Sequence, residues 1–160
     1  MNPILRNSLL VASLLAALPL AAAPQVSEVW SRPTAGDAGT AAGFLRLRNP
    51  GPDDDRLLGA SSERAASIEL HQLVEHDGVA GMRPLPEGLA IPAGGELRLA
   101  PSGVHLMLFG LRAPLRLGER VPLILHFERA GAVPVALHVE AAAPETPEPA
   151  ATGTGGHGHH

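Results

Sequence analysis

The 160-residue sequence contains no cysteine, and its aromatic side chains amount to three phenylalanines and one tryptophan. The absence of cysteine excludes a disulfide-stapled scaffold, a lipid-anchored leader of the kind that needs a cysteine, and any thiolate metal ligand. Because aromatic side chains are so few, Leu, Val, Ile and Ala must build the core. The formal net charge is −4 and the arginines are scattered, so we expect no nucleic-acid partner and no cationic helix on a membrane surface.

The first part of the chain has the pattern of a secretory leader. Arg6 supplies a positive charge before an apolar run from Ser8 to Leu20, and the small residues Ala21-Ala22-Ala23 follow. The run has thirteen residues, whereas a membrane-spanning helix needs about 20, which disfavours an uncleaved anchor; a buried core helix is the other alternative. We therefore predict that residues 1–23 are a leader cleaved near residue 22 or 23, and that the exported protein does not insert into the membrane.

Residues 24–140 are predicted to form one all-β domain. Short stretches of alternating apolar and polar residues are separated by turn signals such as Asn49-Pro50-Gly51-Pro52 and His76-Asp77-Gly78. Stretches of this length and spacing, without a helical period, favour a single antiparallel β-sandwich or barrel. The candidate strands are Val26–Ser31, Ala42–Asn49, Arg56–Ala60, Ser67–Val74, Met82–Leu85, Glu96–Leu99, Val104–Phe109, Val121–Glu128 and Val133–Val139.

The composition changes after Val139. Residues 141–160 are rich in Ala, Pro, Thr, Glu and Gly without apolar periodicity, so we expect a flexible tail. The tail ends in a histidine-rich segment, whose irregular spacing argues against a vector-derived tag. His157, His159 and His160 are candidates for a weak secondary metal site that collects Cu(II), Zn(II) or Ni(II), since imidazole suits all three ions.

Only two methionines remain beyond the predicted leader, Met82 and Met107. A single methionine is usually a core filler, but Met107 follows His105 by two residues in a predicted strand. Alternation along a strand puts these two side chains on one face and Leu106 and Leu108 on the other, with the Cα atoms of His105 and Met107 about 6.6 Å apart. The leucines supply the core, so His105 and Met107 are candidate metal ligands.

A second histidine and methionine are predicted to lie near each other across a hairpin. His71 shares a strand face with Glu69, while Ile68 and Leu70 form the apolar face. Met82 follows His71 after ten residues, beyond the turn predicted at His76-Asp77-Gly78. If the two segments pair around this turn, His71 and Met82 come close to opposite each other, although a slip of one residue would move either side chain to the other face.

Two imidazoles and two thioethers form a neutral and fairly soft ligand set, which favours Cu(I). The set lacks the carboxylates that hard metals prefer, the cysteines of structural zinc sites and the cysteine of blue-copper sites. Thioethers also suit the periplasm, where paired thiols tend to form disulfides. We therefore predict a Cu(I) site formed by His71, Met82, His105 and Met107, and expect the remaining domain histidines, His76, His126 and His138, to lie on the surface.

The sequence resembles the periplasmic copper(I) chaperones called PCuAC, whose metal motif is a His, ten residues, a Met, about twenty-one residues and then His-x-Met. Here ten residues separate His71 from Met82, and twenty-two separate Met82 from His105-Leu106-Met107. The resemblance extends over about Val29 to Val139. Leu73 and Ala80 stand where many members carry additional methionines, so contacts that assist ligand exchange are expected to differ.

The resemblance implies a cupredoxin-like β-sandwich of Greek-key type that binds one Cu(I) in the periplasm through the four residues named above. It also implies a copper-accepting partner, either the CuA subunit of cytochrome c oxidase or a Sco-type thiol protein, and we expect a monomer. No hydrolytic motif is present, and we expect no enzymatic activity. The alternatives are a copper-dependent periplasmic oxidoreductase, a copper-sequestering resistance protein, and a structural sandwich without metal.

Overall fold

The structure, a computed structural model, describes residues 22–144, and this part of the chain contains ten strands and no helix. Almost all of the predicted leader and the histidines of the tail lie outside these residues. Within residues 22–144 there is accordingly no helix long and apolar enough to cross a membrane. The strands are β1 (Gln25–Ser31), β2 (Thr40–Arg48), β3 (Asp55–Ser61), β4 (Ser67–His76), β5 (Val79–Pro84), β6 (Leu89–Ile91), β7 (Glu96–Leu99), β8 (Val104–Phe109), β9 (Arg120–Phe127) and β10 (Gly131–Val139).

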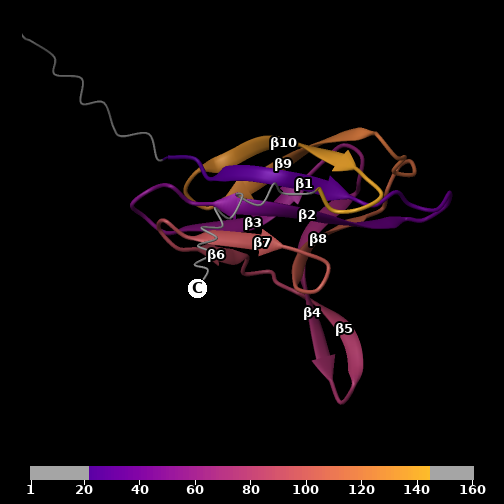
Figure 1. Ribbon diagram of the computed structural model, residues 1–160, viewed down its shortest axis with the longest axis horizontal. Coiled ribbons are helices and arrows are strands. Elements are labelled where there is room, and N and C mark those ends of the chain that lie inside the picture. The colour runs from indigo at the N-terminus through magenta and orange to yellow at the C-terminus, as the bar shows by residue number, and fades with distance from the viewer. Residues whose placement is uncertain (1–21, 145–160) are drawn as a thin grey trace, which may run out of the picture.

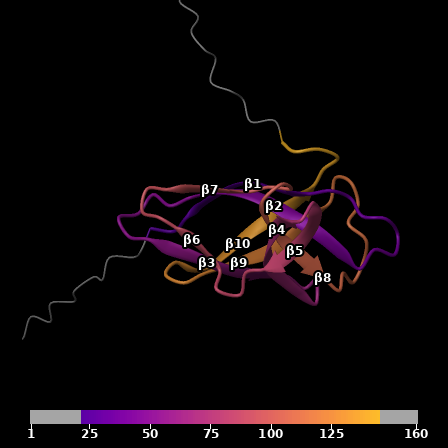
Figure 2. The same ribbon diagram turned by 90° about the horizontal axis from the view of Figure 1, so that it is seen from below.

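All ten strands belong to one sheet that folds back on itself. The strand order is β5-β4-β8-β2-β1-β10-β9-β3-β6, with β7 also paired to β2, and a bridge between Ala60 and Ile68 joins β3 to β4. Seen along the sheet, β1, β2 and β7 lie in one layer, and β3, β6 and β9 lie in the other (Figure 2). Pairing is antiparallel except between β1 and β10, so the predicted all-β sandwich is confirmed.

The nine predicted strands are all present, and two of them have the predicted bounds, Glu96–Leu99 and Val104–Phe109. The sequence did not predict β6, because its three residues are too few to show an alternating pattern between Gly88 and Pro92. Alternation elsewhere is reliable because one face of each strand packs in the interior and the other faces outward.

The core is aliphatic, as the composition predicts. Full burial of a leucine side chain contributes about 1.5–3 kcal/mol relative to exposure, so the buried leucines supply most of the apolar stabilisation of the fold. His105 is the one polar side chain among the largest fully buried residues of the described chain, which makes it an exception that needs a physical reason. The other fully buried residues are Ile91 and the leucines Leu45, Leu47, Leu57, Leu99, Leu106, Leu108, Leu115, Leu123, Leu125 and Leu137.

The β4–β5 hairpin extends beyond the body of the sandwich (Figure 1). His76 pairs with Val79, so Asp77 and Gly78 form a two-residue loop, and both have positive φ angles, 51° and 75°. This conformation suits Asp-Gly in a tight hairpin turn. Every residue of β5 is exposed. The hairpin is therefore joined to the rest of the sandwich through β4, which pairs with β8.

Candidate metal centre

His71 and His105 lie directly opposite each other on the neighbouring antiparallel strands β4 and β8. Their neighbours Leu70 and Leu106 are also paired and are buried in the core. Side chains alternate along both strands, so the leucines fill the interior while the two histidines share the outer face. Directly opposite residues have Cβ atoms about 4.5–5.5 Å apart, and two imidazoles at that spacing can converge on one ion.

The two methionines lie on the same outer face as the histidine pair. Met107 is two residues from His105 along β8, and Met82 on β5 is opposite the residue two positions from His71. Met107 is opposite Glu69, and Met82 is opposite Leu73 rather than His71. The sequence predicted only that His71 and Met82 come close to opposite each other; with Asp77 and Gly78 as the loop, His71 is opposite Pro84, two residues from Met82. A shift of two residues keeps the face, so Met82 is a diagonal neighbour of His71, at about 7–8 Å between backbone positions.

Exposure rises from one side of the cluster to the other. His105 is 2% exposed, and the His71 side chain is 13% exposed. Met107 is half-buried, whereas Met82 on the hairpin is 53% exposed. The cluster thus has a buried side against the sandwich and an open side at the hairpin.

Hydrogen bonds orient both imidazoles and leave each with one available nitrogen. His105 Nδ1 lies 3.3 Å from the carbonyl oxygen of Gly103, which can only accept, so Nδ1 carries the proton and Nε2 has the lone pair. His71 Nε2 donates to Glu69 Oε2 at 3.1 Å. Its Nδ1 is buried and has no hydrogen-bond partner. Histidine ligands of metals usually donate their other ring N–H in this way, so both rings are prepared to bind an ion.

One aromatic ring lies near each of the two imidazoles. The His71 ring is 5.5 Å from the Phe109 ring, and the His105 ring is 6.1 Å from that of Phe44. Burial lowers the pKa of His105 and the nearby His71 lowers it further, while the hydrogen bond to Gly103 acts in the opposite direction. The lowered pKa keeps His105 neutral, and a neutral imidazole is the form that binds metals.

The sequence did not identify Glu69 or Gly103 as partners of the histidines, nor Phe44 and Phe109 as their neighbours. For Glu69 a signal existed, because it precedes His71 by two residues and therefore shares its face. The contact between Phe44 and His105 joins β2 to β8, and no local pattern predicts it.

The other histidines of the domain are separate from this cluster. His76 lies in the exposed turn 3.3 Å from Asp77, and His126 lies 2.8 Å from the Ser61 hydroxyl. His126 is opposite Ala132 and His138 is opposite Arg120, so the two are not cross-strand neighbours. Residues 22–144 contain no group of three or more His, Asp or Glu side chains suited to a metal ion. His157, His159 and His160 fall outside the described residues.

A family model described as "LpqE-like: Putative lipoprotein LpqE-like" matches residues 25–139. Among curated proteins, the "Putative lipoprotein Lxx21020" of Leifsonia xyli subsp. xyli is 39% identical over 116 residues, which cover 72% of this chain and 69% of that protein. The match spans nearly the whole described domain.

Solved structures share the fold. The solution structure of CuI-DR1885 from Deinococcus radiodurans is 32% identical, with a TM-score of 0.56 over 79% of this chain and 82% of that one. The copper-bound PCuAC domain from PmoF2 has a TM-score of 0.61 at 23% identity, covering 74% of this chain and 93% of that domain. At 23% identity, the similarity to the PmoF2 domain shows the fold alone. That fold is the cupredoxin-like sandwich that the sequence resemblance implied.

Proposed function

The chain belongs to the LpqE-like (PCuAC) family, and from that premise we propose that it is a copper chaperone, which binds one Cu(I) ion and delivers it to a partner protein. The proposed ligands are His71, Met82, His105 and Met107. The observation that carries the proposal is the pair of opposed histidines, in which the buried Nδ1 of His71 has no hydrogen-bond partner. An unsatisfied buried nitrogen is costly unless a ligand fills that role.

The chemistry of the donor set supports copper(I) as the cargo. Neutral imidazoles and thioethers are soft ligands that add no negative charge, which suits a monovalent soft ion better than Zn²⁺ or Ca²⁺. Glu69 would hold His71 in the tautomer whose Nδ1 is free, and Gly103 would do the same for Nε2 of His105.

The exposure of Met82 supports transfer rather than permanent storage. A recipient that offers thiolates can replace the exposed thioether first, and the ion then moves ligand by ligand from the hairpin side. Thiolates bind Cu(I) more strongly than thioethers because they are charged, so exchange runs toward the recipient. We propose that this recipient is the CuA subunit of cytochrome c oxidase or a Sco-type thiol protein, that transfer occurs in the periplasm, and that the chain acts as a monomer without enzymatic activity.

A competition titration with a chromogenic Cu(I) chelator tests the proposal on the exported full chain. We expect one Cu(I) per chain, and an affinity lowered by more than about tenfold in each of His105→Ala and Met82→Ala, since each loses a direct ligand. His76→Ala is the matched control, because His76 lies on the same hairpin but is exposed in the turn.

An unchanged affinity in either ligand variant, with circular dichroism showing an intact fold, would overturn the ligand assignment. Loss of copper from His76→Ala would overturn it as well. Dioxygen consumption by the copper-loaded chain above that of free copper would favour an oxidoreductase instead.

For the tail we propose a secondary Cu(II) site at His157, His159 and His160. Deleting residues 153–160 should lower the Cu(II) stoichiometry and leave Cu(I) binding unchanged. A Cu(II) stoichiometry that survives the deletion contradicts this second site.

A further inference from the structure

β5 is an edge strand whose outer side is open along the hairpin (Figure 1). Within residues 22–144 it pairs with β4 alone. His76 and Val79 close the two-residue loop as a hydrogen-bonded pair, and bonded pairs then alternate along an antiparallel ladder. The amide of Leu85 donates to the carbonyl oxygen of Leu70 at 2.8 Å, which fits the same alternation. The odd-numbered residues of β5 therefore direct their backbone groups toward β4, and the even-numbered residues direct theirs outward.

Ala80 and Met82 thus each offer an amide and a carbonyl group on the open side. Pro84 offers a carbonyl only, because proline has no N–H, so full pairing ends there. Natural edges are usually protected by charged residues or proline, yet Ala80 and Met82 are uncharged and exposed. An edge of this kind binds extended segments as an additional strand.

The open edge carries one of the proposed copper ligands. In an added antiparallel strand, the residue opposite Met82 forms a hydrogen-bonded pair with it, at about 5.5 Å between Cα atoms. Side chains of opposed residues share a face, so this residue lies beside the Met82 side chain, which is 53% exposed. A cysteine at this position would present its sulfur on the face where His71 and His105 lie.

Two charged side chains near Met82 select the neighbours of that cysteine. Glu75 is opposite Ala80 on the metal face, and Arg83 follows Met82 on the other face; both are exposed. Within the described residues neither forms an ion pair. A long cationic side chain opposite Ala80 can extend across this small residue to Glu75, whose strand is about 10 Å from the added one. Arg83 suits an acidic residue directly opposite it.

Gly81 leaves room for a bulky apolar residue in the added strand. Nothing lies within 4 Å of the position that its Cβ would occupy. Because the strands run antiparallel, the added segment reads acidic, cysteine, apolar, basic from its N-terminal end. A second copy of β5 fits this edge less well, since its metal face carries only Ala80, Met82 and Pro84 and brings no cation to Glu75.

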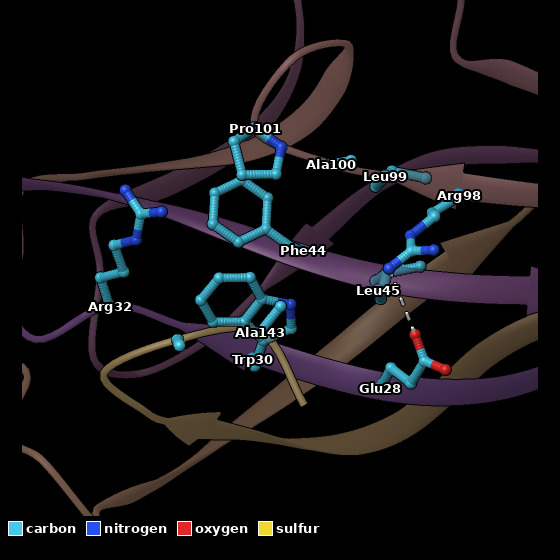
Figure 3. A pocket seen from close by; sticks show the side chains of 11 residues that line it. Glu28, Trp30, Arg32, Phe44, Leu45, Arg98, Leu99, Ala100, Pro101 and Ala143 are labelled. Atoms are coloured by element: carbon cyan, nitrogen blue, oxygen red, sulfur yellow. Dashed lines mark ion pairs between the residues drawn. The ribbon is translucent and has the colours of Figure 1, made fainter. Parts of the chain in front are cut away.

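The Phe44 side of the metal centre gives a partner no comparable access. The Phe44 ring lies 6.1 Å from the His105 ring and 4.8 Å from the Trp30 ring (Figure 3). Trp30 and Phe44 are each only 5% exposed. In the same hollow Arg98 is paired with Glu28. A partner therefore reaches the centre from the hairpin side.

We propose that the copper-accepting protein docks an extended segment with the pattern acidic, cysteine, apolar, basic antiparallel to β5. Docking needs no metal, whereas the role of the cysteine rests on the copper transfer proposed above. The thiol releases its proton to solvent, the thiolate binds Cu(I), and the bond between the ion and Met82 breaks, while copper remains Cu(I). Pairing raises the effective concentration of the thiol at the exposed ligand.

NMR of the metal-free full chain with the end-blocked synthetic peptide Thr-Glu-Cys-Val-Lys-Thr tests docking. We expect the peptide to shift the amide signals of Ala80 and Met82, and to slow their exchange with solvent about tenfold when it is present at about ten times its Kd. Ala80→Pro removes an outward amide and should abolish the Met82 effects, whereas Ala80→Ser keeps the amide and should preserve them. Both variants should bind Cu(I) as the unmodified chain does, which checks that the hairpin is intact.

Exchange of charges tests the register. Glu75→Gln should weaken peptide binding about two- to fivefold at low salt, as expected for an exposed ion pair. Glu75→Lys should bind a peptide that has glutamate in place of lysine as tightly as the original pair binds. Glu63→Gln is the matched control, since Glu63 is exposed but precedes β4, at the end of that strand away from the hairpin tip.

Transfer from the copper-loaded chain tests the position of the cysteine. The peptide Thr-Glu-Val-Cys-Lys-Thr, docked in the same register, directs its thiol to the other face. It should therefore accept Cu(I) about tenfold more slowly or less. Equal transfer rates for the two peptides would overturn the placement of the cysteine opposite Met82.

Three further results separate this docking from the alternatives. Unshifted Ala80 and Met82 amides, or Met82 shifts that survive in Ala80→Pro, would overturn the docking and leave the proposed copper site untouched. Changes in these amides with protein concentration alone would show that a second copy occupies the edge, and would overturn it as well. A chain that docks the peptide but binds no Cu(I) would instead contradict the proposed function.

Discussion

At the scale of single residues, the contact between Glu69 and His71 decides which imidazole nitrogen faces the site. Replacing Glu69 by Ala removes the acceptor at 3.1 Å from Nε2 and allows the proton to move to Nδ1. We expect Cu(I) affinity to fall by about tenfold or more, the usual cost of losing such a partner, in a competition titration.

Glu75→Ala is the control for that prediction, because Glu75 lies on the same face of β4 but nearer the exposed tip. Equal affinities for Glu69→Ala and the unmodified chain would show that His71 keeps its tautomer without Glu69.

The lowered pKa of His105 also predicts how stability depends on pH. The folded pKa lies below the ordinary value of 6.5, so the unfolded chain binds the proton first as the pH falls. This contribution to stability is fully present above about pH 6.5 and is lost as the pH falls toward the folded pKa of His105. Urea unfolding of the metal-free chain between about pH 7.5 and 5 should show this decline.

His105→Gln should flatten the decline, while His76→Gln should keep it. Glu119 does not interfere in this range, because its hydrogen bond from Arg64 lowers its pKa further below the ordinary 4.5. A pH profile that is identical with and without His105 would contradict the assignment.

Among individual side chains, the sequence predicted the shared face of His105 and Met107 because strand alternation requires nothing beyond the strand itself. It did not predict that His105 would be 2% exposed. Outward-facing residues of a sandwich are usually exposed, and the cover here comes from Phe44, which lies far away in the sequence.

At the scale of elements, the β4–β5 hairpin carries Met82, and its position depends on the Asp77-Gly78 turn. Gly78 has φ 75° and open space around its missing side chain, so substitution there acts through backbone strain of about 1–2 kcal/mol. We expect Gly78→Val to increase hydrogen exchange of the β5 amides and to weaken Cu(I) binding, with little change in the global unfolding midpoint.

Gly81→Ala serves as the comparison, since Gly81 has no positive φ and nothing lies within 4 Å of the added carbon. If both variants bind Cu(I) as the unmodified chain does, the hairpin is not what positions Met82.

This hairpin also shows where prediction from sequence reaches its limit. The turn signal predicted the pairing of the two strands but not which turn residues form the loop, and a difference of one loop position moves the pairing by two residues. The prediction for Met82 remained useful because a two-residue shift preserves the face.

At the scale of the whole molecule, the leucine core and the candidate metal ligands lie on opposite faces of β4 and β8. Leu125 is fully buried and is paired with Val133 of β10 and Ala60 of β3, neither of which is one of the four candidate ligands. Leu125→Ala should lower the free energy of unfolding by about 2–5 kcal/mol, since it opens a cavity. Cu(I) affinity of the folded chain should not change, because no cluster residue is among its partners.

Denaturant unfolding and chelator competition on the same samples separate the two effects. Met82→Ala should give the converse result, with weak copper binding and an unfolding free energy near that of the unmodified chain, since Met82 is 53% exposed. If Leu125→Ala weakened copper binding as strongly as Met82→Ala, core and cluster would not be independent.

The fold class could be predicted because nearly every strand shows alternation, and alternation records which face is buried. The closure of the sheet could not be predicted, because it depends on long-range pairings such as the bridge between Ala60 and Ile68 and the parallel contact of β1 with β10. The local sequence patterns of those segments do not indicate which strands they pair with.

The gradient of exposure from His105 to Met82 has a kinetic consequence. On the proposed function, an ion would arrive and depart on the hairpin side, and by microscopic reversibility the forward and backward paths would share one barrier. A change at the hairpin tip that spares all four side chains, such as one at Val79, which is 70% exposed, would therefore scale loading and unloading rates by the same factor. The transfer rate of the proposed carrier would then vary while its equilibrium constant, which the four proposed ligands set, stays the same.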